Sequence, residues 1–238
     1  MRYLQKERAD MEELTVIIPT YNRPQILKYT VTNLLRNLRY SNWIHFLIGN
    51  DGDEDLDFGG GFDNIEVIPG PKRGLGANLN MLLKEVETDL ILQLDDDHHL
   101  VQPLDINQFA QDLLNFKSQV GWIRLFLGTE EDLNNDDPFY NFSAKMYGRY
   151  WFPMPGVDEL YIPSNRPHLK HKRFHEYYGY YEEGLKLGET ETDFCHQYAD
   201  LHQARAGERD RPWVVIPVAM PSFDTWQHVG QSYQRQGY

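Results

Sequence analysis

Two kinds of apolar pattern alternate through the first hundred residues, and this alternation restricts the fold more than any other feature. Short runs of β-branched and other apolar residues predict strands at 14–18, 45–48, 65–68 and 90–94. Apolar residues at helical spacing predict one helix from Pro24 to about Leu38 and a second that carries Leu79, Leu82, Leu83 and Val86. The order strand, helix, strand, strand, helix, strand is typical of an α/β domain with a mostly parallel central sheet flanked by helices.

The last of these strands is followed at once by three carboxylates, Asp95, Asp96 and Asp97. Side chains alternate along an extended chain, so we expect Asp95 and Asp97 on one face and Asp96 on the other. Negative charges this close repel one another unless something offsets them, and divalent cations such as Mg²⁺ prefer carboxylate oxygens. Open α/β sheets bind ligands at the carboxyl ends of their strands. The stretch predicts a metal-dependent site; the competing interpretation is a solvated acidic turn.

Composition limits the classes of protein to which the chain can belong. Its 238 residues are 41% hydrophobic and 25% charged, with a formal net charge of −13, which argues against a nucleic-acid surface. The apolar runs are too short to span a membrane, and residues 1–14 lack the apolar region of a signal peptide. The single cysteine, Cys195, fits a reducing compartment. We expect one cytoplasmic domain over residues 1–238.

The second half of the chain is less regular. We expect a helix over 105–116, a strand over 120–127, a helix over 192–204 and a final strand over 213–218. The segment from Gly128 to about Arg166 breaks the pattern and is rich in aromatic residues. These aromatics either stack on a sugar ring or form a small satellite core.

Four stretches, taken in order, resemble motifs of the family 2 glycosyltransferases. Residues 15–23 read Thr-Val-Ile-Ile-Pro-Thr-Tyr-Asn-Arg, and residues 50–55 read Asn-Asp-Gly-Asp-Glu-Asp. The run Asp95-Asp96-Asp97 matches the family's DxD motif, and residues 188–194, Gly-Glu-Thr-Glu-Thr-Asp-Phe, resemble its later Glu-Asp-x-Asp segment. Departures in two of the motifs affect the expected roles. In the second motif Asn50 replaces the first acid and Asp53 replaces the usual serine, and in the last motif Thr190 with Glu191 replaces the Glu-Asp pair.

The resemblance implies a GT-A fold, with a nucleotide-sugar-binding half at about 14–100 and an acceptor-binding half at about 101–238. It implies an inverting transfer of a sugar from a nucleotide-diphosphate donor to an acceptor hydroxyl, with Mn²⁺ or Mg²⁺ as cofactor. The residues that it implies for donor binding are Pro19, Thr20, Tyr21, Arg23, Asp51, Arg73, Asp95 and Asp96.

The resemblance also implies the metal ligands. Asp95 and Asp97 would be the DxD pair, with Asp97 the more direct ligand. Many GT-A enzymes are similar in returning a C-terminal histidine to the metal, which makes His228 the candidate third ligand; the alternative is a structural or surface histidine. His98 and His99 are closer in sequence, but neighbours in an extended chain face opposite ways.

A base must take the proton of the acceptor hydroxyl during such a transfer. Glu189, Glu191 and Asp193 lie just before the expected helix at 192–204, with Thr190 or Thr192 as its cap. Acids at a helix start also suit the helix dipole, so one or two of them are expected to be first-turn carboxylates. Glu191 aligns with the family's base and is the first candidate; Asp193 is the second.

Two other functions compete with this one. A sugar nucleotidyltransferase would need a glycine-rich phosphate loop with a lysine directly after the first strand, where this chain has Pro19 to Arg23. A catalytically inactive nucleotide-sugar- or glycan-binding module would not need the acids at positions 95, 97 and 191. Both features favour the glycosyltransferase.

Overall fold

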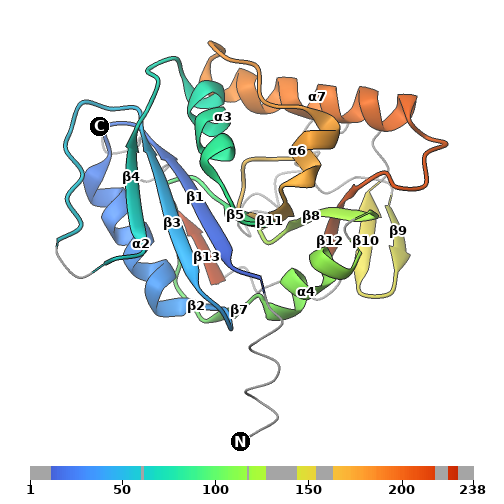
Figure 1. Cartoon of the computed structure of the whole chain (residues 1–238), viewed down its shortest axis with the longest axis horizontal. Coiled ribbons are helices and arrows are strands. Elements are labelled where there is room, and N and C mark those ends of the chain that lie inside the picture. The colour runs from blue at the N-terminus through green and yellow to red at the C-terminus, as the bar shows by residue number, and fades with distance from the viewer. Residues whose placement is uncertain are drawn as a thin grey trace, which may run out of the picture.

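The computed structural model describes residues 12–59, 62–116, 118–126, 144–153, 163–217 and 225–229. Within them, nine strands form one sheet in the order β4-β3-β1-β5-β11-β8-β12-β10-β9 (Figure 1). These strands are β1 (Leu14–Thr20), β3 (Ile44–Asn50), β4 (Ile65–Pro69), β5 (Leu90–Gln93), β8 (Val120–Arg124), β9 (Ala144–Tyr147), β10 (Tyr150–Pro153), β11 (His168–His171) and β12 (Trp213–Pro217).

The helices and two small sheets complete the domain. The helices are α2 (Pro24–Asn37), α3 (Leu75–Glu85), α4 (Asn107–Asn115), α6 (Arg173–Tyr178) and α7 (Leu187–Ala204). One small sheet pairs β6 (His98–Leu100) with β13 (Trp226–His228), and the other pairs β2 (Leu38–Arg39) with β7 (Leu104–Asp105).

The direction of the strands differs between the two halves of the large sheet. As expected, β4, β3, β1 and β5 are parallel throughout. Beyond β5 the sheet is mixed, because β11 runs antiparallel to both β5 and β8, and β10 runs antiparallel to both β12 and β9. The parallel half therefore gathers the ends of four strands at one edge.

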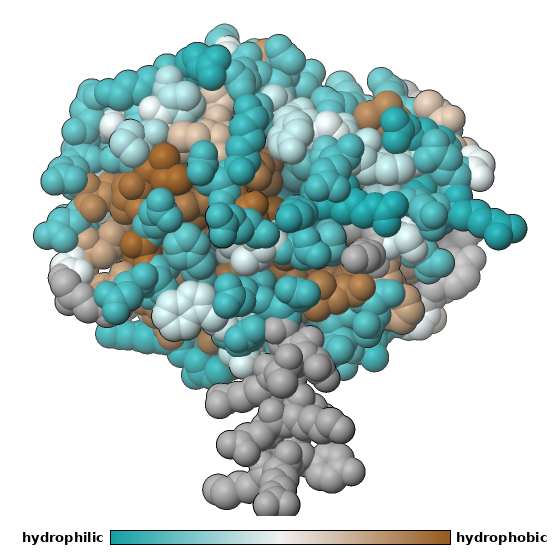
Figure 2. All heavy atoms as spheres, viewed as in Figure 1, coloured by the Kyte–Doolittle hydropathy of each residue, from teal (hydrophilic) through white to brown (hydrophobic). Residues whose placement is uncertain are grey.

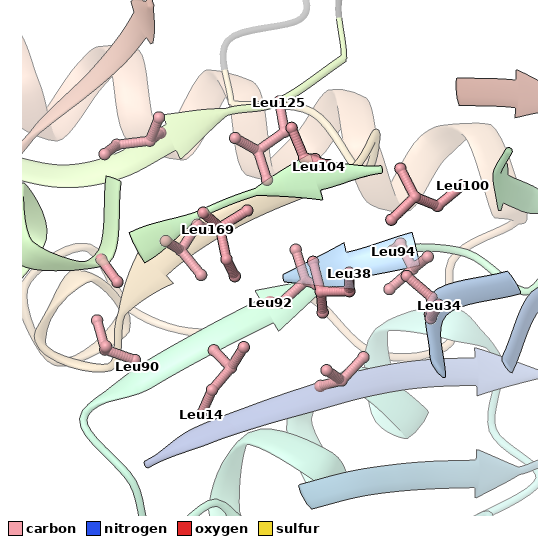
Figure 3. Close-up of a cluster of buried hydrophobic side chains, with 14 of the residues drawn as sticks. Leu14, Leu34, Leu38, Leu90, Leu92, Leu94, Leu100, Leu104, Leu125 and Leu169 are labelled. Atoms are coloured by element: carbon pink, nitrogen blue, oxygen red, sulfur yellow. The ribbon is translucent and has the colours of Figure 1, made fainter. Parts of the chain in front are cut away.

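Helices cover both faces of the sheet (Figure 1). Alternate residues of β1 face opposite sides: Leu14, Val16 and Ile18 join a core with α2 and α4, whereas Ile17 joins a second core with α3, α6 and α7. Figure 3 shows the leucine-rich first core, to which β1, β5, β11 and α2 all contribute. This arrangement is the three-layered α/β architecture that the alternating pattern predicts.

Two elements of the second half differ from expectation. Helix α7 begins at Leu187, before the expected start at residue 192. Strand β11 and helix α6 were not expected, because three of the four residues of β11 are basic or histidine. All four are nevertheless buried, since β11 lies between β5 and β8 in the middle of the sheet.

Most of the aromatic segment at 128–166 lies outside the described residues, including Phe139, Tyr140 and Phe142. In its described part, Tyr150 is buried and its hydroxyl donates to Asp112 at 2.5 Å. Phe152 packs against the first core, whereas Trp151 is partly exposed. Tyr150 and Phe152 thus act as packing residues, but of the first core itself and not of a separate satellite core.

The face seen in Figure 2 is mainly hydrophilic, with apolar side chains gathered in smaller patches. Among the described helices, none is both long and apolar enough to cross a membrane.

Candidate active site

The parallel half of the sheet brings the predicted donor residues to one edge. Thr20 at the end of β1 pairs in register with Asn50 at the end of β3, and Ile17 pairs with Gln93 at the end of β5. The loops that follow these strands hold Tyr21, Asp51 and the acidic run at 95–97. Binding sites of open α/β sheets lie at this edge.

Arg23 ties the acidic run to the loop after β1. Its guanidinium lies 2.5 Å from Asp96 Oδ1 and 2.9 Å from Asp97 Oδ2. Thr20 Oγ1 also donates to Asp96 Oδ2 at 2.5 Å, and Thr30 Oγ1 donates to the Asp96 carbonyl at 2.5 Å. Asp96 is therefore held by the protein itself, close to the start of α2, where the helix dipole favours a negative charge.

The expectation that Asp95 and Asp97 share one face, with Asp96 on the other, is wrong. Strand β5 ends at Gln93, and the chain turns at Asp96 and Asp97, so both of these carboxylates reach Arg23. The alternation rule applies only to extended chain, and it fails here because the extended stretch stops before the acids begin.

The three acids differ in the pKa of their carboxyls. Burial raises the pKa of Asp96 to about 6, although Arg23 and Thr20 oppose the shift. Burial, together with the charges of Asp97 and Glu191, raises the pKa of the half-buried Asp95 well above its usual value. For Asp97, burial is outweighed by the hydrogen bond with His228 and by the nearby basic groups of His98, His228 and Arg23, so its pKa is lowered.

Asp97, His98 and His228 form a group that can hold a metal ion. Their ligand atoms all lie within 4.8 Å of one another. His98 Nδ1 is 3.5 Å from Asp97 Oδ1, and His228 Nε2 is 3.5 Å from Asp97 Oδ2. Antiparallel pairing of β6 with β13 sets His98 opposite His228, and their rings stack at 4.8 Å.

The donor atoms of this group fit a divalent cation. Two ligand atoms, each about 2.1 Å from one ion, lie roughly 3.0–3.5 Å apart at ordinary coordination angles. Asp97 Oδ1 and His98 Nδ1 are buried polar atoms without a hydrogen-bond partner among the described residues, and such atoms need an explanation. Burial lowers the pKa of His98 to about 3, so that its imidazole stays neutral as a ligand must.

The group differs from the expected ligand set in two ways. His228 lies beside Asp97 as predicted, but His98, which the sequence reasoning set aside, is also a member, and Asp95 contributes no ligand atom. His98 and His99 do face different ways, since the His99 ring packs on Tyr29 at 4.5 Å. Alternation alone could not say which of the two histidines faces Asp97; that depends on the pairing of β6 with β13.

The predicted base lies inside α7 rather than just before it. Glu191 is half-buried, and its Oε1 accepts a hydrogen bond from the Asn165 backbone N–H at 2.9 Å. Its charge helps to raise the pKa of Asp95, so Glu191 lies near the acidic run. Two residues further along a helix, Asp193 points about 200° away from Glu191.

The first turn of α7 explains the third acid. Glu189 Oε2 accepts a hydrogen bond from the Lys186 backbone N–H at 3.2 Å, so Glu189 is a first-turn carboxylate. The prediction that Thr190 or Thr192 caps the helix is wrong, because both hydroxyls donate to carbonyls four residues earlier, those of Lys186 and Gly188.

The remaining donor residues line the loops around the acids. Asp51 is buried, and its Oδ1 accepts from the Lys72 backbone N–H at 2.5 Å. Tyr21 is exposed at 64%, and Pro19 is buried in β1. Arg73 is paired with Glu183 at 2.8 Å on the wall of a hollow of about 440 Å³. An acid therefore already neutralises the charge of Arg73 before any ligand arrives.

Comparison with known families decides which class of protein has this site. The family model of glycosyl transferase family 2 matches residues 15–144. The chain belongs to glycosyl transferase family 2. Family membership confirms the resemblance seen in the sequence and the expected enzyme class. No curated protein matches the chain in sequence.

Solved structures share the fold of this family 2 domain. A crystal structure of GalNAc-T7 with UDP, GalNAc and Mn²⁺ matches with a TM-score of 0.60 at 10% identity, over 87% of this chain and 43% of that one. Two crystal structures of S. aureus TarS 1–349, the second with UDP-GlcNAc, match with TM-scores of 0.56 and 0.54 at 14% and 12% identity. The two matches cover 58% and 56% of the TarS chains, and each covers 87% of this chain. The expected GT-A fold is confirmed, and this chain spans about half the length of these structures.

Proposed function

We propose that this family 2 domain transfers a sugar from a nucleoside diphosphate donor to an acceptor hydroxyl with inversion at the anomeric carbon. The observation that carries the proposal is the meeting of Asp97, His98 and His228 at the carboxyl edge of the parallel strands, with Glu191 near Asp95 of the same acidic run. The donor half is residues 14–100 and the acceptor half residues 101–238. The unpaired, buried Cys195 supports a cytoplasmic location.

Asp97, His98 and His228 are the proposed ligands of the divalent cation. Two imidazoles and one carboxylate suit Mn²⁺ better than Mg²⁺, which binds mainly oxygen ligands. When bound, the ion offsets the charge of the diphosphate leaving group. The loop residues Tyr21 and Asp51 bind the nucleoside, and Arg23 supports the acidic run. Asp95, half-buried and facing Glu191, lies where it can contact the donor.

Glu191 is the proposed general base. The Asn165 backbone N–H holds its Oε1, which leaves Oε2 to receive the proton of the acceptor hydroxyl. The acceptor oxygen then bonds to the anomeric carbon on the face opposite the departing diphosphate, and the C–O bond to the diphosphate breaks. Such proton transfer contributes about 10²-fold or more to the rate.

The proposal is tested first by binding. UDP, GDP, dTDP and CDP are screened by thermal shift with and without Mn²⁺, since a ligand that binds the folded state raises Tm. UDP is the first candidate, because the GalNAc-T7 structure contains UDP and a TarS structure contains UDP-GlcNAc. Release of the matching nucleotide from its sugar then separates an enzyme from an inactive binding module.

Asp97→Ala is expected to weaken Mn²⁺-dependent nucleotide binding by about 100-fold or more, because it removes the charged metal ligand that lies beside both histidines. His98→Gln is expected to weaken it too, whereas His99→Gln, on the neighbouring residue, leaves it near the wild-type value. Calorimetry with unchanged affinity for Asp97→Ala would show that the metal is held elsewhere.

A further inference from the structure

A buried lysine lies behind the candidate active site. Lys170 in β11 is fully buried, and none of the described carboxylates pairs with it. Its Nζ donates to Gln93 Oε1 at 2.6 Å and lies 4.7 Å from the centre of the Trp122 ring. Burying an amine in this way is costly, and an apolar residue of similar size would avoid the cost.

The second partner of Lys170 fixes the direction of its hydrogen bonds. His175 Nε2 lies 2.7 Å from Lys170 Nζ, and His175 Nδ1 lies 2.9 Å from the Gly179 carbonyl oxygen. A carbonyl only accepts, so Nδ1 carries the proton of the neutral ring and Nε2 is an acceptor. Lys170 therefore donates to both His175 and Gln93.

These contacts determine which way the Gln93 amide points. A glutamine side chain has an acceptor at one end and donors at the other. Because Lys170 donates to Oε1, the Nε2 group of the buried Gln93 must point to the other side chains around it. There it lies 3.3 Å from the Tyr181 hydroxyl and 3.5 Å from Asn165 Oδ1.

Both residues that Gln93 Nε2 reaches lie next to Glu191. The Asn165 backbone N–H donates to Glu191 Oε1 at 2.9 Å. The Tyr181 phenol is buried, and it is also close enough to Glu191 and Asp95 that their charges add to the rise in its pKa. Gln93 itself precedes Asp95 by two residues. A continuous set of contacts thus runs from Lys170 through Gln93 to the carboxylate of Glu191.

We propose that Lys170 is a positioning residue for the transfer reaction: it fixes the direction of the Gln93 amide, which holds Asn165 and Tyr181 around Glu191. The inference rests on the proposed role of Glu191 as the base. Lys170 touches neither the proposed metal ligands nor the loops of the donor half, so its effect belongs to catalysis and not to nucleotide binding.

The test uses Lys170→Met, which keeps the length of the side chain and removes its donors. The donor is the nucleoside diphosphate sugar that the screen selects, with Mn²⁺. We expect kcat to fall by about 10- to 100-fold, the usual effect of a misplaced catalytic group, with the Kd of the nucleotide unchanged. Lys172→Met, on a half-exposed lysine paired with Asp89 just beyond the strand, is the matched control and keeps the wild-type kcat.

A double variant separates positioning from general damage. If Lys170 acts through Glu191, Lys170→Met combined with Glu191→Gln is no slower than Glu191→Gln alone. Should Lys170→Met fail to fold, Gln93→Glu provides the second test. It keeps the acceptor for Lys170 but loses the donors toward Asn165 and Tyr181, so we expect a lower kcat without a lower Tm.

The outcomes distinguish the two proposals. If Glu191→Gln turns over at the wild-type rate, the proposed base is wrong whatever Lys170 does. If Glu191→Gln is slow but Lys170→Met or Gln93→Glu keeps the wild-type kcat, the positioning role is wrong. It is equally wrong if the double variant is slower than Glu191→Gln by the full Lys170→Met factor.

Discussion

Asp97 lies beside more basic side chains than either of its acidic neighbours. It contacts Arg23 and His228 through Oδ2 and faces His98 through Oδ1. These partners keep its carboxyl ionised, whereas the carboxyls of Asp95 and Asp96 have raised pKa values. Three identical residues in a row therefore have different roles. Asp97 is suited to bind a cation, Asp96 anchors the loop after β1, and Asp95 lies near Glu191.

We predict that Glu191→Gln lowers transfer by about 10²-fold or more while donor binding stays nearly unchanged, because the amide keeps the size of the side chain but cannot take a proton. Asp193→Asn is the matched control, on the same helix but pointing elsewhere. Steady-state rates with the selected donor and the Kd of its nucleotide measure both effects. Loss of transfer in Asp193→Asn but not in Glu191→Gln would move the base to Asp193.

Individual site residues could be predicted from the sequence where they belong to a motif. Asp97, His228 and Glu191 were named from their places in the chain, and the structure sets them around one edge of the sheet. The sequence could not show that Glu183 pairs with Arg73, because only the folded chain brings those two segments together. Nor could it show that His98 rather than His99 faces Asp97, because that depends on the pairing of β6 with β13.

Among the secondary-structure elements, those with regular apolar spacing were predicted best. The first four predicted strands and the helices α2 and α3 are all present, because one buried face produces a clear period. Strand β11 was missed, since His168, Lys170 and His171 resemble a solvated loop. These side chains are buried because they have specific partners, and hydrophobic periodicity cannot predict such partners.

We predict that Leu169→Ala in β11 lowers the free energy of unfolding by about 2–5 kcal/mol, as is usual for a large residue removed from a packed core. Leu169 is fully buried in the first core, on a strand that lies between β5 and β8 (Figure 3). Leu35→Ala, on the partly exposed side of α2, is the control and should cost much less. Urea unfolding measures both; equal losses would mean that β11 does not pack into the first core.

For the molecule as a whole, buried histidines couple stability to pH. Burial lowers the pKa of His98, His168, His175 and His202. Below about pH 6.5 these histidines bind protons in the unfolded chain but stay neutral in the folded one. The free energy of unfolding therefore falls as pH falls. Asp95 and Asp96 act in the opposite direction, because their raised pKa values let the folded state bind protons more readily.

We predict that His202→Gln reduces this pH dependence. Burial, with the charge of Arg211, lowers the pKa of His202 to about 3. Removing this imidazole should therefore reduce the slope of the free energy of unfolding against pH by up to about 1.4 kcal/mol per pH unit between about pH 6 and pH 4. His196→Gln, on the exposed side of α7, is the matched control for the substitution itself. Urea titrations at several pH values measure the difference; parallel profiles for His202→Gln and wild type would refute it.

The place of β11 in the sheet has a consequence for how the chain is made. Strand β5 pairs with β1 on one side and with β11 on the other, and residues 94–167 separate β5 from β11 in the sequence. A chain leaving the ribosome completes β4, β3, β1 and β5 first, and one edge of β5 then waits for its neighbour. An unpaired edge is a template for other chains. The half-synthesised domain is therefore most prone to aggregation after β5 has left the ribosome and before β11 has followed it, and the emergence of β11 ends that interval.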